Sequence, residues 1–335
     1  MAPLTAQQVQ DHPSFKTANF LLDIKPTNSG LLPVAEGRGG PINISWETHG
    51  HGPIHLVYIM GLGAFKTSWQ RSCKHFGHDR GDQYTCLVFD NRGMGGSDKP
   101  LMRYSTSEMA KDLIEVCDAQ GWTAPRDLHV IGISMGGCIA QEVAYAIPER
   151  IASLTLISTF PRLIRTTGFV ENIRNRSSMF MPKHIDKQLA QVKRQLWSEE
   201  WLNKPDEQLG IFPTNGDWFT AAELNKQSDT TGAFTVKGFV LQAIACGWHH
   251  KSDAQLKEMG EKIGHQRIHV LTGDVDRMID PIHSKVILAG LGGEEAGVTY
   301  VVYPGVSHVP IVEKRYQYLD LQEKLVQKAV KLNRT

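Results

Sequence analysis

Short apolar runs alternate with helical patterns along much of the chain. Residues 54–59 and 151–158 are apolar runs with the length of buried strands. Residues 107–119 carry apolar side chains at helical spacing and end before Gly121. The same features predict strands at 86–89, 128–132, 268–271 and 298–303 and helices at 135–147, 282–291 and from about 315. This order predicts an α/β fold, with a mostly parallel, doubly wound sheet and helices on both faces.

The rhythm of strands and helices changes at two places. Residues 42–48 alternate between apolar and polar side chains, which predicts a half-exposed edge strand. No strong strand pattern occurs between 161 and about 250, where apolar positions mark one amphipathic helix at 185–196 and 215–217 predict a turn. We therefore expect an N-terminal extension (1–30), a core formed by 31–160 and 251–335, and a helical lid inserted at 161–250.

Composition and charge exclude several classes of protein. The 335 residues are 41% hydrophobic and 21% charged, which is enough apolar material for a sizeable core and argues against intrinsic disorder. The 36 Lys and Arg nearly balance the 35 Asp and Glu, so no global field attracts nucleic acid or acidic membranes. There is no run of about 20 apolar residues and no secretory signal pattern, so we expect a cytoplasmic protein without a transmembrane segment.

Metal and cofactor motifs are also missing from the sequence. The five cysteines are scattered without a CxxC pair, and the fourteen histidines form no HExxH motif. We therefore expect free buried thiols, no metal site and no cofactor.

A candidate nucleophile stands between a predicted strand and a predicted helix. Gly132-Ile133-Ser134-Met135-Gly136 matches G-x-S-x-G, in which small neighbours allow a sharp turn that exposes the serine hydroxyl above the sheet. The alternative is a plain tight turn between strand and helix.

A nucleophilic serine requires a base and an acid that orients it. Two late loops supply both: residues 273–281 contain Asp274, Asp276 and Asp280, and residues 304–309 contain His308. Both loops follow strands, and the carboxyl ends of parallel strands are where α/β sheets bind ligands. The alternatives are a surface histidine and a solvated acidic turn.

Acyl transfer also requires donors for a developing oxyanion. Met60-Gly61-Leu62-Gly63 follows the first buried strand, so the N–H groups of Leu62 and Met135 are the candidate donors. The alternative is a glycine turn required only by packing. A second glycine-rich loop, 90–97, lacks the P-loop Lys-[Ser/Thr] and is expected to support the site.

Together these motifs resemble the α/β-hydrolase fold superfamily, in the branch of serine esterases and lactonases with a helical lid. The resemblance extends from about residue 40 to 330 and implies that Ser134 is the nucleophile and His308 the base. It implies Asp276 as the acid, because the family loop reads Gly-x-x-Asp, with Asp274 and Asp280 as alternatives. Leu62 and Met135 match the oxyanion donors, whereas Met60 replaces the histidine usual before the first glycine.

The resemblance implies cleavage of a carboxylic ester, lactone or thioester of a small, moderately hydrophobic molecule. Serine at this turn argues against haloalkane dehalogenase or epoxide hydrolase chemistry. The same triad could serve an acyltransferase, and the fold could serve a ligand receptor that does not turn over. The chain could also form a homo-oligomer. Apolar lid residues either contact the substrate or only pack the lid on the core: Ile211, Phe212, Trp218, Phe219, Phe234, Phe239 and Trp248.

Overall fold

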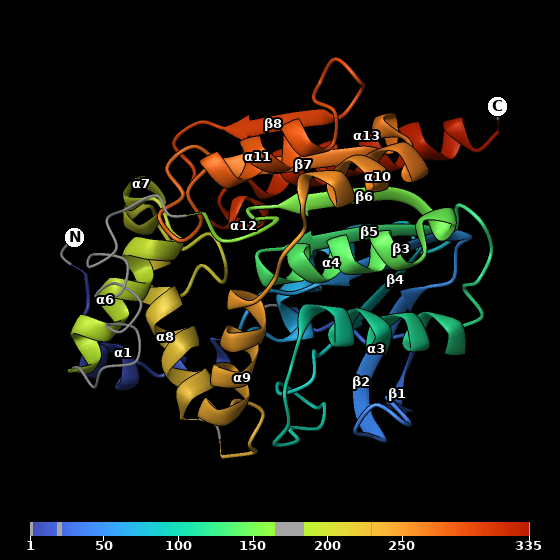
Figure 1. Ribbon diagram of the computed structural model, residues 1–335. Coiled ribbons are helices and arrows are strands. Elements are labelled where there is room, and N and C mark those ends of the chain that lie inside the picture. Colours follow the sequence, from blue (N-terminus) through green and yellow to red (C-terminus); the bar gives the residue numbers. More distant parts are fainter. Residues whose placement is uncertain (1–2, 19–21, 165–183, 229, 335) are drawn as a thin grey trace.

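An eight-stranded sheet forms the centre of the molecule (Figure 1). The computed structural model describes residues 3–18, 22–164, 184–228 and 230–334. The strands, in chain order, are β1 (Asn28–Val34), β2 (Ile42–Gly50), β3 (Ile54–Ile59), β4 (Tyr84–Phe89), β5 (Leu128–Ile133), β6 (Ile151–Ile157), β7 (Ile268–Gly273) and β8 (Thr299–Tyr303). Their order in the sheet is β1-β2-β4-β3-β5-β6-β7-β8. The pairs β1–β2 and β2–β4 are antiparallel and the other five are parallel, which confirms the predicted sheet.

Helices cover both faces of this sheet because successive strand residues point to opposite sides. Val57 and Ile59 pack in the cluster that includes α3 and α4, whereas Leu56 and Tyr58 pack in the cluster on the other face. The core helices are α2 (Gln70–Ser72), α3 (Thr106–Ala119), α4 (Met135–Ala146), α10 (Asp253–Ile263), α11 (Ile282–Gly290), α12 (Pro310–Glu313) and α13 (Arg315–Leu332). Short turns of other helix types are η1 (Phe15–Thr17), η2 (Lys66–Trp69), η3 (Cys73–His78), η4 (Pro148–Arg150) and η5 (His265–Arg267).

The edge of the sheet differs from the prediction. β2 was expected at the edge, but it pairs with β4 on one side and with β1 on the other. β1 escapes pattern recognition because only Val34, at its end, is buried. An exposed strand that contains glycine and proline has no apolar alternation to reveal it.

The insertion, which we define as residues 161–250, lies beyond the carboxyl ends of the parallel strands (Figure 1, left). Residues 165–183 of the insertion lie outside the described residues. Its described helices are α6 (Ile185–Leu196), α7 (Glu199–Asn203), α8 (Asn215–Gln227) and α9 (Val236–Gly247). The predicted turn at 215–217 is wrong: these residues open α8, because the Thr214 hydroxyl caps the helix by accepting from the Asp217 N–H at 3.1 Å.

The N-terminal extension packs on the insertion. Helix α1 (Ala6–Gln10) shares an apolar cluster with Trp197, Trp201 and Trp218. The Trp218 indole N–H also donates to the Ala18 carbonyl oxygen at 3.2 Å. None of the helices within the described ranges is both long and apolar enough to cross a membrane.

Candidate active site

Ser134 occupies a strained turn between β5 and α4. Its φ of +57° and ψ of −125° lie in a region that side chains rarely adopt. The flanking glycines are required here: a Cβ on Gly132 would lie 2.2 Å from the Gly136 carbonyl oxygen, and one on Gly136 would lie 2.2 Å from that of Ile59. Ser134 is half-buried, at the carboxyl end of a central strand. The local sequence therefore produces the sharp turn that a G-x-S-x-G motif predicts.

Asp276 and His308 form a buried pair. The His308 ring N–H at Nδ1 donates to Asp276 Oδ2 at 2.8 Å, and each residue is at most 5% exposed. Asp276 Oδ1 accepts the N–H groups of Met278 and Ile279 at 2.8 and 2.9 Å, so the carboxylate cannot rotate freely. With Nδ1 as the donor, Nε2 carries the lone pair that can accept a proton.

The other two aspartates of this loop serve its backbone. Asp274 Oδ1 accepts the Gly305 N–H at 2.7 Å, and Asp280 Oδ1 accepts the Ile282 N–H at 2.9 Å. Both side chains are exposed. Of the three candidates, Asp276 is the one that the structure brings to His308.

No hydrogen bond joins the Ser134 hydroxyl to His308 among the described residues. A catalytic triad requires one hydrogen bond between nucleophile and base and one between base and acid. The structure contains the second, between His308 and Asp276. Both late loops follow neighbouring strands and contact each other, since the Val275 N–H donates to the Val306 carbonyl oxygen at 3.1 Å.

The loop with Leu62 lies directly against Ser134. A Cβ placed on Gly61 would be 3.1 Å from Ser134 Cβ and 3.6 Å from its Oγ. Within the described part of the chain, the N–H groups of Leu62 and Met135 have no acceptor. The Met135 N–H is free because the first turn of a helix has no preceding carbonyl to bind. Two unpaired donors therefore belong to residues next to the serine.

The glycine-rich loop after β4 supports the loop with Leu62, as predicted. Asn91 donates from Nδ2 to the Met60 carbonyl oxygen at 3.2 Å. The Asp90 carboxylate accepts the backbone N–H groups of Lys66 and Gly96 at 2.8 and 3.0 Å, and the Lys66 ammonium at 3.1 Å.

The insertion contacts the His308 loop through residues that the sequence did not reveal. The His308 backbone N–H donates to the carbonyl oxygen of Leu196, the last residue of α6, at 3.1 Å. Glu313 accepts the backbone N–H groups of Ser307 and Ser198 at 3.1 and 3.2 Å, thereby joining the loop to the residue before α7. Burial raises the pKa of Glu313, although these hydrogen bonds oppose the shift.

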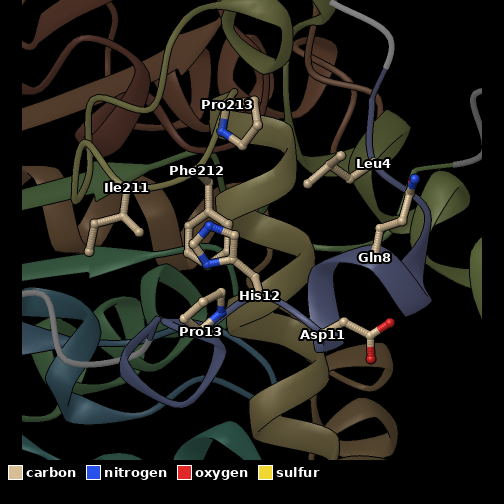
Figure 2. A pocket seen from close by; sticks show the side chains of 8 residues that line it. All are labelled: Leu4, Gln8, Asp11, His12, Pro13, Ile211, Phe212 and Pro213. Carbon is tan, nitrogen blue, oxygen red and sulfur yellow. The ribbon is translucent and has the colours of Figure 1, made fainter.

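A pocket of about 630 Å³ lies elsewhere, between α1 and the loop before α8 (Figure 2). Its lining is formed by Leu4, Gln8, Asp11, His12, Pro13, Ile211, Phe212 and Pro213. The rings of His12 and Phe212 face each other there, with centroids 4.7 Å apart. Of the candidate residues, Ile211 and Phe212 line this pocket. The candidate catalytic residues and oxyanion donors do not, so the pocket is separate from the candidate active site.

The family model for the alpha/beta hydrolase fold matches residues 54–315. The chain belongs to the α/β-hydrolase fold family. The matched range contains all the candidate residues, from Leu62 to His308. Within the described residues, no group of three or more His, Cys, Asp or Glu side chains is placed to hold a metal ion.

Two curated relatives match part of this α/β-hydrolase. RutD of Azorhizobium caulinodans, provisionally named a carbamate hydrolase, is 35% identical over 125 residues, which are 37% of this chain and 44% of RutD. BpoC of Mycobacterium tuberculosis, provisionally named a non-heme bromoperoxidase, is 34% identical over 131 residues, or 38% and 46% of the two chains. The chain thus spans less than half the length of these relatives.

Solved structures share the fold over most of this α/β-hydrolase. A hydrolase from Pseudomonas aeruginosa superposes with a TM-score of 0.68 at 19% identity, covering 90% of this chain and 99% of that one. An esterase from Thermogutta terrifontis has a TM-score of 0.67 at 19% identity, with the same coverage. At this identity the likeness establishes the fold.

The seven apolar residues expected in the lid of this α/β-hydrolase divide into three groups. Phe212, Trp218 and Phe219 are buried in the cluster of the insertion itself. Ile211 and Trp248 are exposed, at 41% and 78%. Phe239 packs on Gly63, and its ring lies 6.1 Å from that of Phe234. These two rings, unlike the other five, therefore belong beside the loop that carries Leu62.

Proposed function

We propose that the chain is a serine hydrolase that cleaves a carboxylic ester, lactone or thioester through an acyl-enzyme on Ser134. The observation that carries this proposal is the buried pair of His308 and Asp276, 2.8 Å apart, in a fold that holds Ser134 on a strained turn. A carboxylate that fixes the Nδ1–H tautomer leaves Nε2 ready to act as a base. The bond between nucleophile and base often tightens only when substrate binds.

In the first half of the reaction, Ser134 Oγ attacks the substrate carbonyl carbon while His308 Nε2 takes the hydroxyl proton. The N–H groups of Leu62 and Met135 donate to the oxyanion of the tetrahedral intermediate. His308 then returns the proton to the leaving alcohol or thiol, and the acyl group remains on Ser134.

In the second half, water attacks the acyl-enzyme. His308 removes a proton from the water, the oxyanion forms again in the same place, and the collapse returns the proton to Ser134 Oγ. Asp276 keeps the imidazole oriented and stabilises its cationic form throughout.

The aromatic side chains near the candidate oxyanion donor favour a substrate with a moderately hydrophobic acyl or alcohol group. Phe239 and Phe234 place aromatic surface beside Gly63, next to the candidate donor at Leu62. Aromatic rings near a polar reaction centre suit an apolar group that is held by contact area.

The test is hydrolysis of p-nitrophenyl esters, lactones and thioesters of graded chain length, by the wild type and by Ser134→Ala. We expect turnover by the wild type and a loss on the order of 10⁴- to 10⁶-fold in the variant. The control is Ser107→Ala, which removes an exposed hydroxyl on α3. Full activity in Ser134→Ala would refute the proposal, and transfer of the acyl group to added alcohol instead of water would make the chain an acyltransferase.

A further inference from the structure

A buried amide on helix α9 connects two loops of the core. Gln242 is fully buried, and its Oε1 accepts the Gly63 N–H at 3.0 Å. Its Nε2 donates to the Arg92 carbonyl oxygen at 2.9 Å. Gly63 offers a donor and Arg92 an acceptor, so the orientation of the amide is determined by its neighbours. The oxygen and the nitrogen of the Gln242 amide therefore each form a hydrogen bond.

The loop that Gln242 holds is the loop with Leu62. Gly63 follows Leu62 directly, so its N–H belongs to the peptide plane that ends Leu62. On its other side the same loop contacts Ser134, since a Cβ on Gly61 would lie 3.1 Å from Ser134 Cβ. The loop is therefore fixed between the serine and Gln242, with the unpaired N–H of Leu62 between the two contacts.

Close packing of α9 keeps the amide in place. A Cβ on Gly238 would lie 2.0 Å from the Gly93 carbonyl oxygen, so the helix approaches the loop after β4 as closely as a backbone can. Phe239 covers Gly63 one residue later. Gly238, Phe239 and Gln242 lie within one and a half turns of α9, and all three contact the loops after β3 and β4.

We propose that Gln242 is a positioning residue for the oxyanion donor: its amide sets the backbone of Gly63 and thereby the direction of the Leu62 N–H. This inference rests on the proposed acyl transfer at Ser134. In this role α9 orients the oxyanion donor, which is distinct from covering the substrate. A misplaced donor weakens stabilisation of the transition state more than binding of the ground state.

The main variant is Gln242→Met, which has nearly the same size and makes neither hydrogen bond. We expect kcat to fall about 10- to 100-fold and KM to change less than about threefold. The matched control is Ile244→Met, which puts the same side chain on the same helix at a position 47% exposed. A kcat within twofold of the wild type in folded Gln242→Met, or a loss confined to KM, would overturn the inference.

A second variant, Gln242→Glu, tests the hydrogen bonds by pH. A protonated carboxyl can donate to Arg92 O and accept from Gly63 N–H, whereas a carboxylate cannot donate. The guanidinium of Arg92 is already paired with Asp112 through two contacts of 2.6 Å. Activity of the variant divided by that of the wild type should therefore rise as the pH falls. A flat ratio across a pH range in which infrared spectroscopy shows the new carboxyl ionising would overturn the inference, even if Gln242→Met does not fold.

The two proposals fail in different ways. If Ser134→Ala keeps its activity, the proposed function is wrong. If Ser134→Ala is inactive and Gln242→Met is as fast as the wild type, the serine mechanism stands and the positioning role of Gln242 is wrong.

Discussion

The rim, which we define as the loops at the carboxyl ends of the parallel strands, and the insertion position the residues of the candidate site in different ways. At the rim, Ser134, Asp276 and His308 each follow a strand within a few residues, so the strand places them. In the insertion, Leu196 and Gln242 reach the same region through contacts with residues more than 100 positions away in the chain. Local sequence therefore determines the chemical groups, whereas tertiary packing determines what surrounds them.

Close contacts of Arg162, His250, Lys251 and Glu142, which we call the junction, join the insertion to the core. The chain leaves the core and returns to it side by side, where Arg162 and His250 form an isolated antiparallel bridge. Beside the bridge, the buried Lys251 pairs with Glu142 of α4, and the Glu142 carboxylate lies 3.4 Å from His249. Changes at the rim should therefore reduce the rate of the reaction, and changes at the junction should reduce the free energy of unfolding.

The largest expected effect is on the rate, at the rim. His308→Ala should lower kcat on the order of 10⁴- to 10⁶-fold, since it removes the group that we propose moves the proton. Steady-state kinetics on an ester that the wild type cleaves measures the loss. The exposed His51→Ala is the control, and a fall of less than tenfold in His308→Ala would remove the histidine from the mechanism.

Two aspartates of the same loop test whether the contact with His308 matters for the rate. Asp276→Asn should lower kcat about 10⁴-fold, because the amide favours the wrong tautomer of His308. Asp280→Asn, four residues later, should stay within about twofold of the wild type, because its exposed carboxylate only accepts a backbone N–H. Equal losses in the two variants would show that the loop as a whole, and not the contact with His308, matters.

At the junction, we expect Glu142→Gln to lower the free energy of unfolding by about 3 kcal/mol, because it leaves the buried Lys251 without its carboxylate partner. Denaturant unfolding measures the change, with the exposed Glu149→Gln as control. Burial opposes ionisation of Glu142, but His249 and Lys251 outweigh it and lower the carboxyl pKa. This stabilisation is present above the unfolded pKa of about 4.5 and is lost as the pH falls through the folded value. An unchanged unfolding free energy at pH 7 would contradict the role of the pair.

The effect that is smallest at neutral pH is on the pH dependence of stability, at a buried histidine in the sheet. Burial lowers the pKa of His269, on β7, to about 3. Between pH 6.5 and 3 the unfolded chain binds a proton that the folded chain does not, so stability falls as the pH falls. His269→Leu should flatten this slope and leave kcat at pH 7 unchanged. Unfolding at several pH values measures it, His51→Leu is the control, and an unaltered slope in His269→Leu would argue against a neutral buried imidazole.

The strands, the turn at Ser134 and the two late loops were predictable because each depends on a short stretch of sequence. Contact between Asp276 and His308 needed the family resemblance, since three aspartates in one loop look alike. β1 was missed because its side chains are exposed, and the start of α8 was missed because Asn215-Gly216-Asp217 resembles a turn. Gln242 left one signal: apart from Lys237 and Cys246, it is the sole polar side chain in α9, and a lone amide among apolar residues requires partners.

Labelling with a fluorophosphonate, followed by mass spectrometry of the peptides, tests most directly whether Ser134 is an activated nucleophile. The probe should modify Ser134 in the native protein, and neither Ser134→Ala nor heat-denatured protein should react. Modification of a different serine would contradict the role of Ser134. No modification of the folded wild type would contradict the mechanism and favour a chain that binds a ligand without turning it over.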